Sequence, residues 1–461
     1  MGVHSYRLAT PMALLALGTL ACARSELELG RLGPGGIGIG GTTTSSAGGA
    51  AGSGGHGGGG GAGGGGGVAG SWACEALVVT GELRQLGPTV NPSMFGSSAD
   101  GSRVTVAAHM NLVYGFPPLT NVHHTSFEPW GAWPSQDPSQ GFLVQPLGRE
   151  ELAAAPMDDG SFALLYGVDT PNGPSPARLA PRVPIAAQGT GPVELPLTSG
   201  PSSPRFLAHD GGTAHFFGVA EPGTSSVALL GGWTDTPPGG TPLWIDKTVG
   251  CADDRVVADA VFVAPDRWVL AVAAPIQDCA PNLAPAAGSR RWLTTSVFHG
   301  FAGPQSPGVE WFAGQSVEGL DLAPGPGKIW LSFRRAGGPI EVAALSSNGT
   351  QEAEPVSITH PDEEPFEHAI TAFGPGAAIA FVDRAPEHYR VVVRVLDAQA
   401  TPVATLALPS PDEFPNAGAW GRPAIIASPS GDALLVAWTD WNGYNDAAVE
   451  GHVVRLECGS P

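Results

Sequence analysis

The sequence predicts an all-β fold, and two features of the chain support that prediction. The 461 residues include 67 Gly and 45 Pro, too many turn-forming residues for a mainly helical chain. After the N-terminus no segment keeps an apolar period of 3.6 residues, whereas short apolar runs separated by Gly, Pro and Asp turns are frequent. We therefore expect short strands joined by tight turns and longer loops.

The clearest repeat lies at residues 422–456. We expect a first strand at Ala424–Ala427, a turn at Pro429–Asp432, a second strand at Ala433–Trp438 and a third strand at Val449–Leu456. The turn recurs at an average interval of about 55 residues, and its marker residues are Gly101, Gly160, Gly212, Asp266, Gly327, Gly376 and Gly431. A fixed period of this length predicts a seven-bladed β-propeller with four-stranded blades over residues 73–461. A pair of β-sandwiches with similar hairpins is the alternative.

The cysteines test this prediction because they were not used to find the repeats. The last unit ends at its third strand with Cys458, while an unassigned strand at residues 76–86 follows Cys74. We predict that this strand completes the last blade and that a Cys74–Cys458 disulfide locks the ring. Cys251 and Cys279 flank the first hairpin of the fourth unit and form a second predicted disulfide. Zinc is the competing explanation for four cysteines, but no CxxC spacing of a structural zinc site occurs.

The N-terminal residues predict that the protein is exported from the cytoplasm. Residues 1–21 contain an apolar run of 14 residues, Leu8–Ala21, which is too short to span a bilayer and is typical of a signal peptide. The run ends in Thr-Leu-Ala before Cys22 and resembles the lipobox of bacterial lipoproteins, although Thr19 stands where Leu is usual. The resemblance implies that Cys22 is lipidated. Residues 22–72 are mostly Gly, Ala, Ser and Thr, which predicts a flexible tether.

Localisation follows from these segments. We expect an extracytoplasmic, membrane-anchored lipoprotein that faces the periplasm or the cell surface, with secretion as the alternative. Two disulfides agree with an oxidising compartment. The formal net charge of −20 argues against nucleic acid and anionic lipid as partners. Contact with the membrane is therefore expected only through the lipid anchor, and the chain is expected to be a monomer.

In blade pattern, though in no diagnostic motif, residues 73–461 resemble the seven-bladed propeller modules of bacterial secreted and surface lipoproteins. The resemblance implies a non-catalytic module that binds or scaffolds a protein or a glycan at the cell envelope. The alternative is a polysaccharide hydrolase or lyase with carboxylates near the channel mouth. A structural subunit of an envelope complex is a third hypothesis. The sequence contains no G-x-S-x-G motif for a serine nucleophile, and no catalytic residues are assigned.

Candidate ligand-binding residues lie in the loops that join second to third strands. These loops should gather on one face of a propeller, together with the connections between blades. The first is expected to run from Asn111 to Gln140, and its rings suit stacking on sugars or apolar side chains: Tyr114, His123, His124, Trp130 and Trp133. Packing of the rings against neighbouring blades is the alternative. Adjacent histidines on an extended segment point to opposite sides, so no metal site is predicted there.

The corresponding loop of the last unit supplies three further candidates, Asp440, Trp441 and Tyr444. Calcium at Asp440, Asn442 and Asp446 is an alternative, but Tyr444 occupies the third ligand position of the calcium-loop pattern. Turn formation alone accounts for these residues, so no cofactor is expected. The charged pairs Arg334–Arg335 and Asp383–Arg384 should lie on the same face as a solvated rim.

Overall fold

In the part of the chain that the computed structural model describes, regular structure consists of strands only. The chain divides into two compact units, Met1–Gly49 and Ala50–Pro461, and every described residue belongs to the second. The described residues are 74–81, 84–87, 89–96, 101–111, 120–131, 139–143, 148–156, 162–170, 173–183, 193–194, 201–210, 213–220, 226–234, 245–252, 257–264, 267–274, 292–299, 309–311, 317–384, 389–408, 418–441 and 449–459. Among them no helix is long and apolar enough to cross a membrane. The expected signal peptide, tether and lipidated Cys22 lie outside these ranges.

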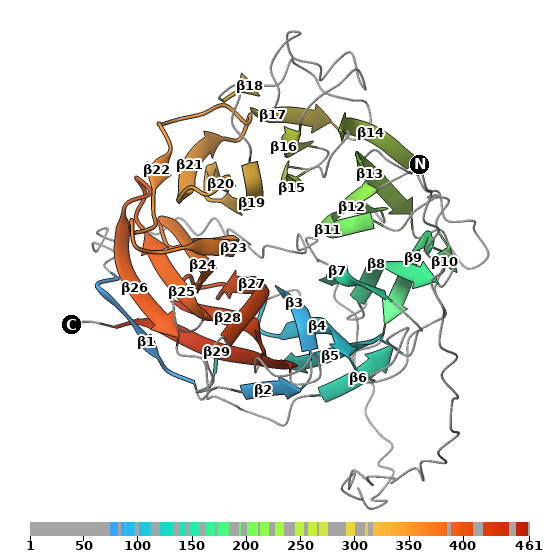
Figure 1. Cartoon of the computed structure of the whole chain (residues 1–461), viewed down its shortest axis with the longest axis horizontal. Helices are drawn as coiled ribbons and strands as arrows, with labels where there is room; N and C mark the ends of the chain where they lie inside the picture. Colours follow the sequence, from blue (N-terminus) through green and yellow to red (C-terminus); the bar gives the residue numbers. More distant parts are fainter. Residues whose placement is uncertain are drawn as a thin grey trace, which may run out of the picture. The chain divides into compact units, whose positions relative to one another are not determined.

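Five sheets are single four-stranded antiparallel meanders, numbered one to five in chain order (Figure 1). Meander one is β3 (Thr89–Gly96), β4 (Val104–Asn111), β5 (Thr120–Phe127) and β6 (Ser139–Leu143). Meander two is β7 (Gly148–Pro156), β8 (Phe162–Thr170), β9 (Gly173–Val183) and β10 (Val193–Glu194). Meander three is β11 (Pro201–Asp210), β12 (Thr213–Ala220), β13 (Ser226–Thr234) and β14 (Ile245–Ala252). Meander four is β15 (Val257–Ala264), β16 (Arg267–Ala274), β17 (Trp292–His299) and β18 (Val309–Glu310). Meander five is β19 (Val317–Gly325), β20 (Lys328–Arg335), β21 (Ile340–Ser346) and β22 (Val356–Ser357).

The sixth sheet has nine strands and contains two further meanders. A single parallel pair, Tyr389 with Gly418, joins them. Meander six is β23 (Pro365–Phe373), β24 (Gly376–Arg384), β25 (Tyr389–Leu396) and β26 (Pro402–Leu408). Meander seven is β27 (Gly418–Ala427), β28 (Ala433–Trp441) and β29 (Val449–Gly459), completed by β1 (Ala76–Val79) and β2 (Arg84–Gly87) from the other end of the chain.

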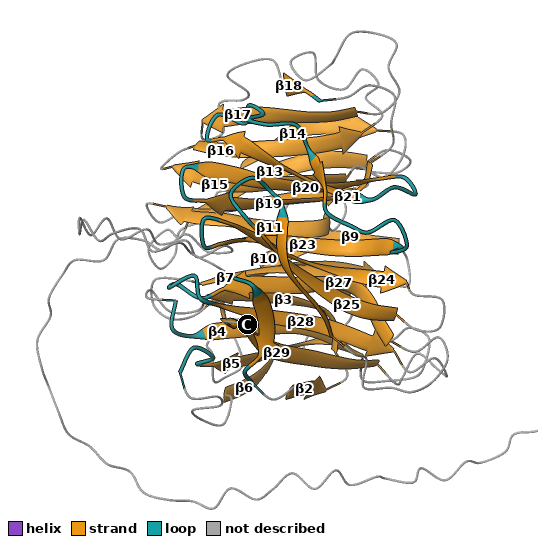
Figure 2. Ribbon diagram, turned by 90° about the vertical axis from the view of Figure 1, so that its left-hand side faces the viewer, coloured by secondary structure: helices purple, strands orange, loops and turns teal. Residues whose placement is uncertain are grey.

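The meanders are arranged as in a β-propeller. The first strand of each meander contacts the first strand of the next, from β3 through β7, β11, β15, β19 and β23 to β27, and β27 contacts β3. Figure 1 shows these strands around the centre, and Figure 2 shows the meanders side by side in the perpendicular view. Six of the seven predicted turn markers fall between a first and a second strand, and Gly376 begins a second strand. The repeat therefore located the hairpins correctly.

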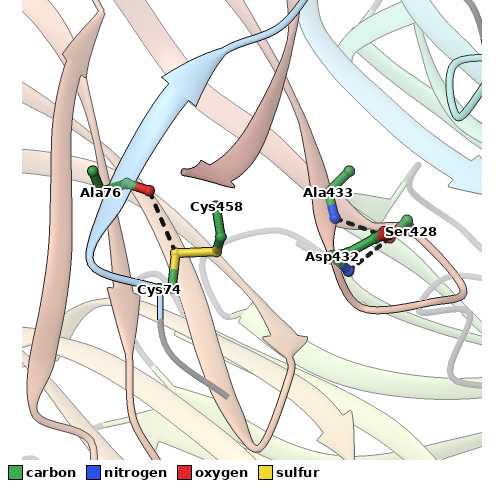
Figure 3. Close-up of a disulfide and its surroundings, with 6 residues drawn as sticks. All are labelled: Cys74, Ala76, Ser428, Asp432, Ala433 and Cys458. Carbon is green, nitrogen blue, oxygen red and sulfur yellow. Dashed lines mark hydrogen bonds between the residues drawn. A yellow bond between two sulfur atoms is a disulfide. The ribbon is translucent and has the colours of Figure 1, made fainter. Parts of the chain in front are cut away.

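The predicted meeting of the two chain ends is confirmed. The expected strand at residues 76–86 is split in two: β1 pairs with β29 from Ala76↔Gly459 to Val79↔Leu456, and β2 pairs with the N-terminal part of β29. Cys74 and Cys458 form a disulfide with a Cα–Cα distance of 4.9 Å (Figure 3). Cys251 lies in β14, whereas Cys279 lies outside the described residues, so their pairing stays a prediction.

Apolar clusters fill the spaces between neighbouring meanders. One cluster joins meanders four and five, a second joins five and six, and a third joins six and seven. A fourth contains Leu86 of β2, Val104 of β4 and Leu435 of β28, so it joins meander seven to meander one. Burying each such side chain contributes about 1.5–3 kcal/mol, so these clusters hold adjacent meanders together.

One expectation about the first unit is wrong. Residues between Asn111 and Gln140 do not form one long loop, because β5 lies within them. This strand pairs with β4 along its whole length and with β6 over part of it. Pairing on both edges overrides the polar composition of the segment, which contains two adjacent histidines.

Candidate ligand-binding site

Two faces of the propeller follow from the strand order. We call the turn face the one with the turns between first and second strands and the connections between third and fourth strands. The loop face has the connections between second and third strands and those between meanders. The sequence predicts binding on the loop face, and the predicted residues are placed as follows.

The described candidate residues of meander one lie in or directly after a strand, not in a loop between second and third strands. His123 and His124 lie within β5, opposite Ala108 and Ala107 of β4, so they belong to the sheet. Only the backbone of these two histidines is described, so their binding role stays a prediction. Tyr114 and Trp133 lie outside the described residues.

Trp130 serves the packing of the propeller. It follows β5, the third strand of its meander, and therefore lies on the turn face, contrary to prediction. Its Nε1 donates a hydrogen bond to the carbonyl of Gly101 at 2.8 Å, and its ring packs on the cluster between meanders seven and one. Arg455 of β29 donates to the carbonyls of Pro129 and Gly131 at 2.8 and 2.6 Å. These contacts agree with the alternative interpretation, packing against a neighbouring blade, and ligand binding by Trp130 stays a prediction.

Asp440 is also an internal residue. It lies in β28 with 2% of its surface exposed. Its Oδ1 accepts a hydrogen bond from Trp438 Nε1 at 3.1 Å, and its Oδ2 lies 3.3 Å from His452 Nε2. Trp441 ends β28, and the backbone alone is described there; Asn442, Tyr444 and Asp446 lie outside the described residues. Within the described ranges no group of three or more His, Cys, Asp or Glu side chains could hold a metal ion.

Buried carboxylates on the inner strands hold neighbouring meanders together. Asp259 of β15 accepts the backbone N–H of Leu322 in β19 at 2.6 Å. Asp321 of β19 repeats this contact one meander later, accepting the N–H of Ile370 in β23 at 2.7 Å. Its other oxygen lies 2.8 Å from the guanidinium of Arg422. Both carboxylates are at most 1% exposed, so neither is placed to meet a large substrate.

The loop face of meanders five and six carries a different kind of cluster. Two second strands end there in arginine, β20 at Arg334–Arg335 and β24 at Arg384. The first strand β23 begins beside them, with Phe366 as its second residue, and the third strand β25 begins with Tyr389. We call Glu318, Arg334, Phe366, Arg384 and Tyr389 the Arg384 cluster.

The Arg384 guanidinium lies against an aromatic ring. Its Cζ is 3.5 Å from the centroid of Phe366 and 5.6 Å from that of Tyr389. Arg334 approaches the same Phe366 ring at 6.0 Å, and its guanidinium is 2.8 Å from a carboxylate oxygen of Glu318. Two cations thus share one ring, an arrangement that the negative face of the ring stabilises.

Asp383 fixes the position of the cluster. Its Oδ1 accepts the backbone N–H of Glu364 at 3.0 Å, and its Oδ2 accepts from Arg390 Nε at 3.0 Å. In return Arg384 donates its backbone N–H to the carbonyl of Glu364 at 3.0 Å. The start of β23 is therefore tied to the end of β24, and Phe366 is held where Arg384 lies.

The charged residues of the expected rim lie on the loop face, but only some of them are exposed to solvent. The side chains of Arg334 and Asp383 are only 12% and 3% exposed, whereas that of Arg335 is 33% exposed. Phe366, the centre of the cluster, was missed. The sequence gives little reason to select Phe366, because a single Phe near the start of a predicted strand is common and indicates no binding site.

Comparison with known proteins supports the β-propeller fold and assigns neither a family nor a function. No family model and no curated protein matches the chain. Among solved structures, the BP39L lectin from Burkholderia pseudomallei is 14% identical, with a TM-score of 0.52 over 81% of this chain and 98% of the lectin. The β-propeller domain of the Trilobed protease from Pyrococcus furiosus is 9% identical, with a TM-score of 0.45 over 81% and 96%. The polysaccharide lyase Uly1 is 8% identical, with a TM-score of 0.47 over 78% and 88%.

Proposed function

We propose that this chain is a non-catalytic binding propeller, presented outside the cytoplasm, that recognises a partner through its loop face. The observation that carries the proposal is the Arg384 cluster, where partly exposed arginine and aromatic side chains are held rigidly at the ends of strands. Arginine and aromatic residues supply much of the binding energy of protein surfaces, and rigid placement reduces the entropy lost on binding.

The inner-strand carboxylates favour binding over catalysis. A hydrolase or lyase needs an acid and a base that reach the substrate. Asp259 and Asp321 instead accept backbone N–H groups in the interior. Those carboxylates therefore have a structural role, and the Arg384 cluster contains no pair of carboxylates flanking a shared space.

The site is tested with purified full-length protein, a panel of glycans and a pull-down from envelope extracts. The variant with Arg334→Ala and Arg384→Ala should lose the captured ligand. Arg103→Ala is the matched control, because Arg103 lies on the turn face, is 34% exposed and pairs with Glu128 at 3.1 Å. Equal retention by both variants would place binding elsewhere. Turnover of a polysaccharide by the wild-type protein would overturn the non-catalytic assignment.

The cellular location of the protein is part of the same proposal. Lipidation of Cys22 with residues 22–72 as a tether would hold a closed seven-bladed ring away from the membrane. Cys22→Ala should then move the protein from the membrane fraction to the soluble fraction. A wild-type protein that is already soluble and extracellular would replace the lipid anchor with secretion.

A further inference from the structure

The donors of Arg384 remain available to a ligand. Guanidinium stacking on Phe366 uses the face of the group, so the ring does not consume the N–H donors at its edge. Within the described residues no ion pair with a carboxylate involves Arg384; its Nε is buried without a hydrogen-bond partner, so the terminal nitrogens are the donors left for a ligand. This contrasts with Arg334, Arg335 and Arg390, each of which is paired with a carboxylate. A planar, partner-free guanidinium on a rigid ring matches a carboxylate in bidentate geometry.

The surroundings of Arg384 also select the ligand. The carboxylate of Glu318 is 43% exposed beside Arg334, and Glu364 is exposed at the start of β23. These groups can only accept hydrogen bonds, so they match hydroxyl donors and repel further negative charge. Tyr389 adds a partly exposed ring next to the guanidinium, and such rings stack on apolar C–H faces.

From this combination we infer that the Arg384 cluster binds a uronic acid unit of a glycan. The carboxylate of the sugar accepts from Arg384, its hydroxyls donate to Glu318 or Glu364, and its C–H face lies on Tyr389. The inference rests on the proposed binding function and names the ligand class for the same site.

An acidic peptide fits this site less well. Its carboxylates carry no neighbouring hydroxyls for Glu318 and Glu364 to accept from. The net charge of −20 also opposes a dense run of negative charge, whereas a uronate separated by neutral sugars presents one carboxylate at a time.

The test measures binding of uronate oligomers to the purified full-length protein by titration calorimetry. The ligands are oligomers of galacturonate, glucuronate and mannuronate, with the methyl ester of each series as its uncharged counterpart and oligoglutamate as the acidic peptide. We expect at least one uronate series to bind, and its ester to bind roughly ten- to hundredfold more weakly, because the ester loses a charge-assisted bidentate contact. Arg384→Gln should cause a similar loss, and Arg103→Gln should change affinity by less than about twofold.

Several results would overturn this assignment. Equal binding of the ester and the free acid would show that no carboxylate is read, and this comparison needs no variant to fold. Oligoglutamate binding as tightly as uronate would replace the glycan with an acidic peptide. If the wider panel yields a neutral glycan or a protein but no uronate, the uronate assignment fails while the binding function stands. If nothing binds, both fail.

Discussion

Removing the Cys74–Cys458 disulfide should destabilise the propeller strongly. The bond closes a loop of 384 residues, and the chain-entropy relation gives about 6 kcal/mol for a loop of that length. The measured effect should be smaller, about 3–5 kcal/mol, because the unfolded chain keeps some residual structure and β1 and β2 still pair with β29.

The experiment compares the wild type with the variant Cys74→Ala and Cys458→Ala by equilibrium unfolding in urea. Alanine is suitable because Cys74 is 3% exposed and packs in an apolar cluster, where a serine hydroxyl would lack a partner. Val79→Ala is the matched control, since Val79 lies on β1, is 52% exposed and forms no crosslink. The control should change the free energy of unfolding by less than about 0.5 kcal/mol.

A loss below about 1 kcal/mol in the double variant would refute the reasoning, because the crosslink would then restrict the unfolded chain very little. The same variant also tests the second predicted disulfide. Cys251 and Cys279 are 28 residues apart in the sequence, and closing such a loop contributes about 3.5 kcal/mol. Reductant should therefore destabilise the double variant further, and no change would mean that these two cysteines are unpaired.

Three further substitutions test individual contacts. Trp130→Phe should cost about 1 kcal/mol in urea unfolding, because the ring stays but its hydrogen bond is lost; a loss of ligand binding without a loss of stability would return Trp130 to the binding site. Asp321→Asn should cost about 3 kcal/mol, since the buried amide cannot serve both the N–H of Ile370 and Arg422, and an effect below about 1 kcal/mol would contradict the assigned role. The Ser430 hydroxyl, with smaller contributions from other neighbouring hydrogen bonds, lowers the pKa of Asp432 below its ordinary value. Because this pKa is lower in the folded state than in the unfolded chain, ionised Asp432 stabilises the fold at a pH above the unfolded-state pKa. The stabilisation is lost as the pH falls through the folded-state pKa. The stability advantage of wild type over Asp432→Asn should accordingly decrease as the pH falls into strong acid, and a difference independent of pH would contradict it.

Hairpins were predictable from the sequence because their cause is local. Gly327 and Gly431 adopt φ of 76° and 71°, a backbone conformation that glycine takes without strain, so each marks a turn. The pairing of the two chain ends was predictable for a related reason. A repeat that lacks its fourth strand and a spare strand at the other terminus can each bury their edges only by pairing.

The residues of the site were less predictable because their neighbours come from different strands and, for Arg334, from a different meander. Arg384 and Phe366 are brought together by β23 and β24, and Arg334 approaches from meander five. Likewise, Arg455 contacts the carbonyl of Pro129 across 326 positions of sequence. Aromatic content in a long connection therefore pointed to Trp130, a packing residue, and no local pattern pointed to Phe366.

The inner strands show why an acidic residue near a propeller channel is poor evidence for catalysis. A first strand pairs with the second strand of its own meander on one edge only, so the N–H groups of its other edge need acceptors. Asp259 and Asp321 supply acceptors to Leu322 and Ile370 from the preceding meander. Such a carboxylate has a structural role, which does not depend on what the protein binds. An enzymatic role for a chain of this fold should therefore be argued from a carboxylate that the backbone does not already use.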